Sequence, residues 1–182
     1  MGIHIENVMV GVTGGNMAEL KVWVMVGLPC SGKSTWIDTH LKEVVHISQD
    51  DIRRIFYGNQ YFSNAEGYVR GDAKNIARLM LEQGKSIVVD NTAVLSQYRK
   101  EWKILADEYN AEFIIVFIDT PKEVCLGLNK ERYEGKRVPD EVIEKMNNQF
   151  QRPIELVNVE GKHKWWDFGE EVKLVYVSRG DK

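Results

Sequence analysis

Short, continuous runs of apolar residues alternate along this chain with longer stretches in which apolar residues recur every three or four positions. The short runs are rich in branched side chains, which is typical of strands buried on both faces of a parallel sheet. We predict strands over residues 22–26, 44–48, 86–90, 112–119 and 172–177. The run over 112–119 is the plainest of them, because almost every residue in it is apolar.

The stretches between the predicted strands have the spacing of amphipathic helices. We predict helices over residues 34–43, 51–57, 64–83, 96–109, 121–133 and 139–150. Ser96 is expected to cap its helix, and Pro121 and Pro139 suit the first turns of theirs. Strands that alternate with helices of this length require right-handed crossovers. We therefore predict an α/β fold with a mainly parallel sheet that helices cover on both sides.

The composition narrows the class of protein. The chain has 182 residues, the usual size of one domain. Its 43% of hydrophobic and 28% of charged residues, with a mean hydropathy of −0.34, exclude the disordered and collagen-like classes. The net charge of −3 excludes a uniformly basic surface of the kind that coats nucleic acid. A polyanionic substrate would therefore have to meet a local basic groove.

The first residues differ from the rest of the chain. Residues 1–16 end in the turn-prone run Thr13–Asn16, and we interpret them as a terminal extension that is either mobile or added as an edge strand. Residues 17–182 are expected to form a single domain. We find no apolar run of the ~20 residues that cross a membrane, no secretory signal, and too few cysteines for a disulfide framework. We expect a cytoplasmic protein without membrane or disulfide-linked partners.

The segment Gly27–Ser34 fits the pattern G-x-x-x-x-G-K-[ST], directly after an apolar strand and directly before a helical pattern. Its glycines let the backbone N–H groups face phosphate oxygens, and the following helix adds its positive end. Lys33 would neutralise the β- and γ-phosphates, and the Ser34 hydroxyl would bind Mg²⁺. The alternative is a glycine-rich turn without a nucleotide. The predicted binding residues are Gly27, Pro29, Cys30, Ser31, Gly32, Lys33, Ser34 and Thr35.

Polar clusters follow the predicted strands, at the edge of the sheet where α/β proteins bind ligands. Asp50 and Arg53 follow the strand 44–48. Asp50 could accept the proton of an attacking hydroxyl, and Arg53, one helical turn further on, could hold a phosphate. The alternative is that the aspartates only cap the free N–H groups of a helix.

Two more clusters belong to the same edge. Asp90 could support Mg²⁺ or orient an acceptor, and Thr92 could offer a hydroxyl, although both could equally be ordinary turn caps. Residues 129–140 place cations on both sides of Gly135. Such a segment suits a lid that closes over the nucleotide and brings an arginine to the transferred phosphoryl group. Its alternative is a solvated loop.

Four segments, GLPCSGKSTW, QDDIR, VVDNTAVL and NKER…RVPDEVI, resemble the P-loop kinase domain of phage-type and bacterial polynucleotide 5′-hydroxyl kinases. The resemblance spans about residues 21–152. It implies an adenylate-kinase-like sheet of five parallel strands in the order 2-3-1-4-5. It also implies transfer of the ATP γ-phosphate to a 5′-OH end of DNA or RNA, an activity of nucleic acid repair.

Site roles follow from the same resemblance. It implies that Lys33, Asp50, Arg53 and Arg132 are catalytic, with Asp50 as the general base. It implies that Arg132 and Arg137 are lid cations that bind ATP, and that Asp50, Arg53, Asp90 and Thr92 form the acceptor site. Mg²⁺ would be bound by Ser34.

The chain departs from this family in two respects. Leu128 stands where several relatives have an arginine, and no D-x-D-x-T phosphatase signature is present, so an end-healing enzyme of this kind would be the kinase half alone. Other acceptors stay open: a small molecule, a nucleoside, an aminoacyl-tRNA or the sugar nucleotide of a toxin-type kinase. An ATP-dependent switch module is a non-enzyme alternative, in which Arg53 has no role. The choice of RNA or DNA and the oligomeric state are left open.

A few residues outside these motifs have chemistry of their own. His40 and His46 lack partners at metal-ligand spacing, so we assign them structural roles. Cys125 has apolar neighbours in a helix and is expected in the core. The pair Trp165–Trp166 either packs on the sheet or stacks on a base.

Overall fold

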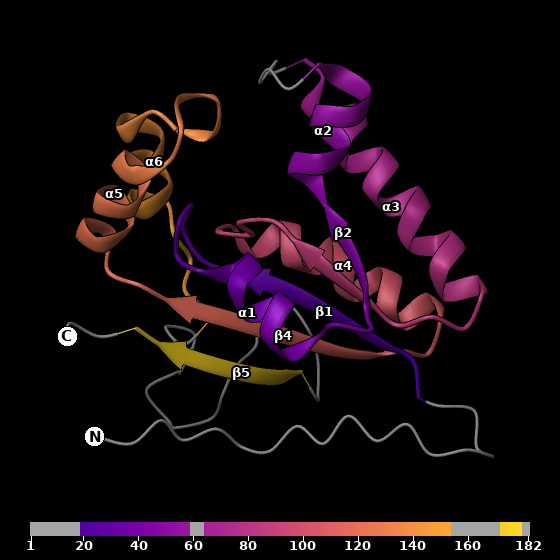
Figure 1. Cartoon of the computed structure of the whole chain (residues 1–182). Coiled ribbons are helices and arrows are strands. Elements are labelled where there is room, and N and C mark those ends of the chain that lie inside the picture. Colours follow the sequence, from indigo (N-terminus) through magenta and orange to yellow (C-terminus); the bar gives the residue numbers. More distant parts are fainter. Residues whose placement is uncertain (1–18, 59–63, 154–171, 180–182) are drawn as a thin grey trace.

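A five-stranded parallel sheet forms the centre of the computed structural model, which describes residues 19–58, 64–153 and 172–179 (Figure 1). The strands are β1 (Lys21–Val26), β2 (Val45–Ser48), β3 (Ile87–Asp90), β4 (Glu112–Asp119) and β5 (Lys173–Ser178). Their order is β2-β3-β1-β4-β5, and every neighbouring pair is parallel. The predicted fold class and the predicted strand order are both confirmed.

The helices lie close to their predicted positions. They are α1 (Lys33–His40), α2 (Gln49–Tyr57), α3 (Glu66–Glu82), α4 (Ser96–Glu108), α5 (Lys122–Glu131), the 3₁₀ turn η1 (Glu134–Lys136) and α6 (Asp140–Asn148). In Figure 1, α2 and the α5–α6 pair extend beyond the carboxyl ends of the strands, on two sides of the loop that follows β1. The carboxyl ends of the strands thus lie on the same side of the molecule as these helices.

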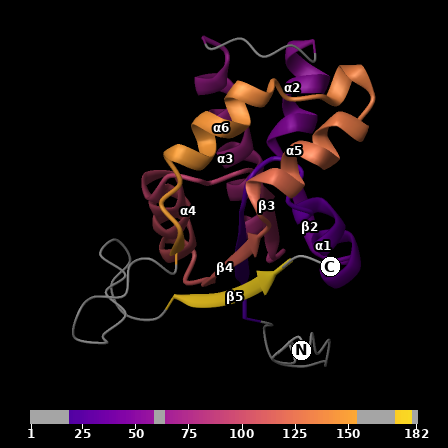
Figure 2. The same ribbon diagram turned by 90° about the vertical axis from the view of Figure 1, so that its left-hand side faces the viewer.

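The two faces of the sheet are buried by different helices. Side chains alternate between the faces along each strand. Val22, Val24 and Val26 of β1 belong to a large core together with residues of α3 and α4, whereas Trp23 and Met25 belong to a smaller core with α1. Figure 2 shows α4 and α1 on opposite sides of the sheet. These five side chains are each at least 96% buried, because both faces of the sheet are covered.

The predicted cap of α4 is wrong. Ser96 is the first residue of the helix rather than its cap, and the cap position is Leu95, an extended residue without a side-chain acceptor. The backbone N–H of Ser96 donates instead to Gln151 Oε1 at 2.7 Å. The acceptor for this N–H group therefore comes from Gln151, in the segment after α6. No local sequence pattern indicates this contact.

Some sequence interpretations concern other parts of the chain. The predicted extension 1–16 and the pair Trp165–Trp166 lie outside the described residues, and their interpretations stay predictions. Across the described segments, we find no helix with the length and apolarity that a membrane span requires.

Candidate active site

The P-loop follows β1 and is fixed from both neighbouring strands. Gly27 has a φ of 153°, and a Cβ there would lie 2.7 Å from Ser31 Oγ and 2.8 Å from the Ile118 carbonyl oxygen, so a side chain does not fit. The N–H of Gly27 donates to the Thr92 carbonyl at 3.1 Å, beyond β3. The Thr120 hydroxyl donates to the Ser31 carbonyl at 2.9 Å, beyond β4. The loop is therefore held between the segments that follow β3 and β4.

Helix α1 begins inside the predicted phosphate-binding motif. The N–H groups of its first turn have no acceptor within the helix and form the positive end of the helix dipole. The Lys33 ammonium lies in the same place and donates to the carbonyls of Gly27 at 3.0 Å and Leu28 at 2.8 Å. Burial lowers the pKa of Lys33, against the opposing effect of the nearby Asp90 carboxylate. This arrangement concentrates positive charge where a phosphate would bind.

The other predicted P-loop residues complete the same turn. Pro29 and Cys30 form its tip, and Cys30 has a φ of 65°, which is uncommon for a residue with a side chain. Thr35 lies in the first turn of α1. Burial raises the pKa of the Cys30 thiol, so the structure does not favour a reactive thiolate there.

Asp90 links the P-loop to the end of β3. The Ser34 hydroxyl donates to Asp90 Oδ2 at 2.8 Å, and His46 Nε2 lies 3.2 Å from the same oxygen. Burial raises the pKa of Asp90, but the contacts with His46, Lys33 and Ser34 outweigh it and lower the pKa overall. The contact with Asp90 in turn raises the pKa of His46. His46, to which we assigned only a structural role, therefore touches a candidate site residue.

Ser34 and Asp90 have the chemistry that Mg²⁺ prefers. Mg²⁺ takes hard oxygen ligands and is usually held by one or two protein oxygens, with substrate phosphates and waters as its other ligands. Within the described segments, no group of three or more His, Cys, Asp and Glu residues could hold a metal ion. A hydroxyl and a carboxylate beside the P-loop lysine fit an ion that the protein shares with a nucleotide.

Helix α2 carries Asp50, the predicted general base, and Arg53, the predicted phosphate contact, and a different residue caps the helix. Ser48 occupies the cap position, and its hydroxyl accepts the Asp51 N–H at 3.1 Å. Asp50 is therefore not the N-cap, although it lies in the first turn of the helix. Its carboxylate is 92% exposed and accepts a hydrogen bond from Arg53 Nη1 at 2.6 Å. Asp50 thus faces solvent at the carboxyl end of β2.

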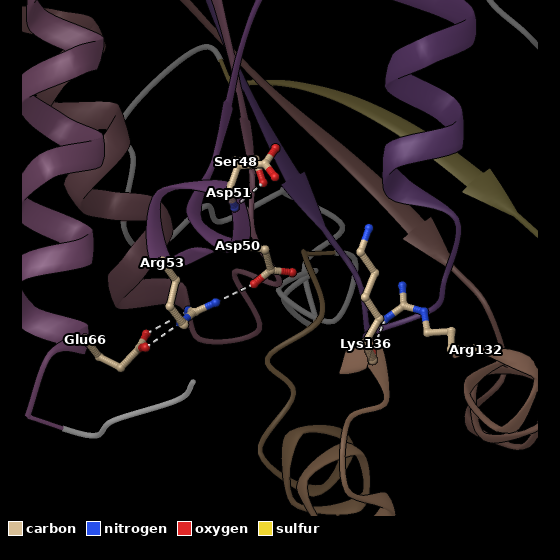
Figure 3. A network of polar contacts seen from close by, with 7 residues as sticks. All are labelled: Ser48, Asp50, Asp51, Arg53, Glu66, Arg132 and Lys136. Carbon is tan, nitrogen blue, oxygen red and sulfur yellow. Dashed lines mark hydrogen bonds and ion pairs between the residues drawn. The ribbon is translucent and has the colours of Figure 1, made fainter. Parts of the chain in front are cut away.

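Arg53 is held by a second carboxylate that the sequence analysis missed. Glu66, at the start of α3, accepts Arg53 Nε at 2.8 Å and Nη2 at 3.0 Å, as Figure 3 shows. The Arg53 and Glu66 side chains are 17% and 13% exposed, so this bidentate pair is largely buried. Hydrogen bonding to Glu66, and secondly to Asp50, raises the pKa of Arg53 despite its burial. The guanidinium is therefore permanently charged and fixed in orientation.

The contacts with Glu66 and Asp50 leave two N–H donors of Arg53 available for a ligand. An arginine has five N–H donors: one on Nε and two on each terminal nitrogen. Glu66 takes one from Nε and one from Nη2, and Asp50 takes one from Nη1. One N–H on each terminal nitrogen is left, which is the number that a bidentate contact with a phosphate uses.

The lid cations differ in what they contact. Arg137 Nε donates to the Arg132 carbonyl and Nη2 to the Lys130 carbonyl, both at 2.7 Å, so Arg137 stabilises the backbone of the predicted lid. Arg132 has one weaker contact, from Nη1 to the Lys136 carbonyl at 3.3 Å. In the view of Figure 3, the Arg132 and Lys136 side chains lie on the opposite side of Asp50 from Arg53. Of the two predicted lid cations, Arg132 is the one with more donors left for a ligand.

Asn129 fixes the base of the lid. Its side chain is 2% exposed, donates to the Val138 carbonyl at 2.6 Å and to Asp140 Oδ1 at 3.3 Å, and accepts the Val138 N–H at 3.0 Å. The Cys30 thiol also lies 3.7 Å from Asn129 Oδ1. The Asn129 amide therefore connects the end of α5 with the segment around Val138 and with the tip of the P-loop.

The structure brings most of the predicted residues to one edge of the sheet. His40 lies elsewhere: its ring stacks on Trp36 with centroids 4.5 Å apart, in agreement with a structural role. Cys125 is fully buried, as predicted. Glu66 and Thr120 were missed. Thr120 directly follows a strand, the signal that identified Asp90, whereas nothing local marks Glu66 as the partner of Arg53.

Comparisons with known proteins agree with this geometry. A family model described as an AAA domain matches residues 22–153. The chain is 25% identical over 138 residues to L-seryl-tRNA(Sec) kinase of Methanococcus maripaludis, covering 71% of this chain and 52% of that protein. It is 26% identical over 144 residues to the putative bifunctional polynucleotide kinase/RNA ligase of Autographa californica nuclear polyhedrosis virus, covering 71% of this chain and 21% of the relative. The chain therefore spans about half or less of the length of these relatives.

Solved structures show the same fold. A putative kinase from Chloroflexus aurantiacus superposes with a TM-score of 0.62, at 15% identity and with 88% of each chain covered. At this identity the likeness concerns the fold alone. The structural likeness covers most of both chains and so reaches beyond the sequence motifs.

Proposed function

Because the chain belongs to the AAA domain family and is a P-loop kinase, we propose that it transfers the γ-phosphate of ATP to the 5′-hydroxyl end of DNA or RNA. The observation that carries this proposal is the arrangement of Asp50, Arg53 and Glu66 at the carboxyl end of β2. It combines an exposed carboxylate with an arginine whose free donors fit a phosphate. An acceptor with a hydroxyl and a phosphate close together, as at a 5′-OH polynucleotide end, matches both groups.

In the proposed reaction, the acceptor oxygen bonds to the γ-phosphorus as the bond to the β–γ bridging oxygen breaks. The electron pair of that bond leaves with ADP, and the hydroxyl proton passes to Asp50. Arg53 holds the acceptor phosphate, and Glu66 keeps Arg53 in place. Lys33 and the first turn of α1 bind the ATP phosphates, and Arg132 adds charge to the transferred group from the lid. Bound Mg²⁺, held by Ser34 and Asp90, would neutralise the phosphate oxygens.

A second acceptor class is a hydroxyl carried by an aminoacyl-tRNA. Its support is the similarity to L-seryl-tRNA(Sec) kinase, of which this chain spans a larger share than it does of the viral polynucleotide kinase. A small-molecule acceptor without a phosphate would use Asp50 equally but would leave Arg53 without a ligand. A nucleotide-dependent switch would need neither residue, so replacing them separates the enzyme from the switch.

The test is a transfer assay with γ-labelled ATP and Mg²⁺. Oligonucleotides of DNA and RNA with 5′-OH or 5′-phosphate ends, and seryl-tRNA, are offered separately. We expect label on the 5′-OH ends and none on the 5′-phosphate forms. Label on seryl-tRNA alone would replace the proposed acceptor with the second class. ATP consumption without label on any of these acceptors would refute both.

Matched variants assign the roles in the same assay. Asp50→Asn is expected to abolish transfer while ATP still binds, and the control Asp51→Asn should stay active, because Asp51 pairs with Arg54 outside the cluster. Arg53→Ala is expected to raise the KM of the oligonucleotide, whereas Arg54→Ala should not. Equal effects within either pair would contradict the assignment.

A further inference from the structure

Arg179 lies against the P-loop, although it is far from the motif in sequence. It directly follows β5, and its backbone N–H donates to the Asp119 carbonyl at 3.0 Å, which continues the pairing with β4 by one residue. A Cβ on Gly32 would lie 2.5 Å from Arg179 Nη1, 2.6 Å from Cζ and 2.8 Å from Nη2. The end of the last described strand therefore reaches the first turn of α1.

These distances define how the guanidinium is oriented. A group that approached the terminal edge of the guanidinium in its plane would be closer to both terminal nitrogens than to Cζ. Here Cζ is closer than Nη2, so the guanidinium presents its flat face to Gly32. The φ of 98° favours glycine at this position, where the guanidinium lies above the backbone.

Arg179 adds positive charge to an end of the P-loop that is already positive. The N-terminal end of α1 is positive, and the Lys33 ammonium lies within the same loop. Among the described residues, no carboxylate forms an ion pair with Arg179, and the Asp119 carboxylate accepts instead from the Tyr176 hydroxyl at 2.9 Å. Arg179 is also exposed. Arg179 is thus the third positive group here, after the N-terminal end of α1 and Lys33. An electron-rich ligand beside Arg179 would stabilise its charge.

The order of the strands indicates which part of a nucleotide comes here. β3 and β2 lie on one side of β1 and carry Asp90 and Asp50 near their carboxyl ends, whereas β4 and β5 lie on the other side (Figure 1). In the proposed reaction the γ-phosphate must face Asp50. With its phosphates in the P-loop, the nucleotide then extends its nucleoside toward β4 and β5, where Arg179 lies.

We propose that Arg179 belongs to the donor site, where its guanidinium, with one face on Gly32, stacks its other face on the nucleobase. A planar, delocalised cation stacks well on a heteroaromatic ring, and lysine does not reproduce this contact. The proposal rests on ATP as the donor. It adds a residue that recognises the nucleoside to a loop that recognises phosphates only.

The test measures dissociation constants of ATP and of inorganic tripolyphosphate for the wild-type protein, Arg179→Ala, Arg179→Lys and the control Arg54→Ala. We expect Arg179→Ala to weaken ATP binding about tenfold. Tripolyphosphate has no base, so its binding should change less than about twofold. Arg179→Lys should leave ATP binding close to that of Arg179→Ala, and Arg54→Ala should match the wild type.

Several results would overturn the inference. Unchanged ATP binding in Arg179→Ala would exclude a contact with the donor. Equal losses for ATP and tripolyphosphate, or full recovery with lysine, would mean that Arg179 acts on phosphates through its charge. A wild-type protein that does not bind ATP would refute the proposed function itself. Because no acceptor is present in this assay, failure of the acceptor assignment would not affect it.

Discussion

Replacing Glu66 by glutamine tests whether the orientation of Arg53 matters for transfer. The substitution keeps the size of the side chain but removes its charge, and it leaves one carbonyl oxygen where two carboxylate oxygens accepted Arg53 Nε and Nη2. The glutamine amide nitrogen is itself a donor and then faces an N–H donor of Arg53, so this contact is lost. Arg53 is freed to turn toward Asp50, whose carboxylate already accepts from Nη1 at 2.6 Å. The variant should therefore disturb the acceptor contact and also engage the proposed base.

The structure sets the expected size of this effect. Hydrogen bonds to charged groups contribute about 1.5–3 kcal/mol, and this pair is largely buried, so solvent screens it little. We expect a cost of about 2 kcal/mol for Glu66→Gln, because one charged bond is lost and a neutral one is kept. If the whole cost appears in kcat/KM, transfer falls about thirtyfold. If it appears in folding, Tm falls by about 4–8 °C in a domain of this size.

The assay is label transfer to a 5′-OH oligonucleotide, with ATP binding and Tm measured in parallel. The control is Glu101→Gln, which breaks the more exposed ion pair of Glu101 with Lys74, at 2.6 Å and likewise between two helices. An exposed pair contributes about 0.2–1 kcal/mol, so the control should stay close to the wild type. Glu66 acts through Arg53, so the effects of Glu66→Gln and Arg53→Ala should not add in the double variant. Additive losses, or wild-type activity of Glu66→Gln, would refute this reasoning.

Other contacts of the site give further predictions. Thr120→Val removes the hydroxyl that donates to the Ser31 carbonyl, so ATP binding should weaken by about 1–2 kcal/mol in a titration, while Thr39→Val, at an exposed hydroxyl of α1, should not affect it. Asn129→Ala leaves the Val138 N–H and carbonyl without their partner; we expect a lower Tm and faster proteolysis of the lid, and an unchanged proteolysis pattern would contradict this role. The raised pKa of His46 means that its pairing with Asp90 favours folding below the ordinary histidine pKa of about 6.5 and that this contribution fades as pH rises through the raised value. The Tm difference between wild type and His46→Asn, measured without Mg²⁺, should therefore be larger at pH 5.5 than at pH 8.5, and the opposite order would show that the sign is wrong.

Sequence patterns predicted those features of this protein that are local. The strand over 112–119 and the P-loop are recognisable because neighbouring residues alone define them, and the strand order followed from the family resemblance. Asp50 and Arg53 are three residues apart on one helix, so their pairing was also within reach of the sequence. The Ser96 cap was wrong because the actual acceptor, Gln151, comes from another part of the fold.

The residues that were missed share a different property. Glu66 is 13 residues from Arg53, across the α2–α3 connection, and Thr120 is 89 residues from Ser31. Arg179 reaches Gly32 only because β5 is parallel to β4. Each contact exists only once the helices or strands that carry it have packed together, and no motif contains both partners. Such contacts follow from the three-dimensional arrangement of the elements, which the motifs alone do not contain.

Under the proposed function, the unequal burial of the two carboxylates on Arg53 determines which of them an acceptor phosphate would displace more easily. Glu66 is 13% exposed and bonded through both oxygens, whereas Asp50 is 92% exposed and bonded through one. Leaving Glu66 unpaired in a largely buried position would be costly, while Asp50 can exchange its contact for water. If a phosphate takes more than the two N–H groups that are left on the terminal nitrogens of Arg53, it therefore competes with Asp50 and not with Glu66. Binding of the acceptor would then release the carboxylate that is to accept its proton, so that one arginine both positions the acceptor and frees the base.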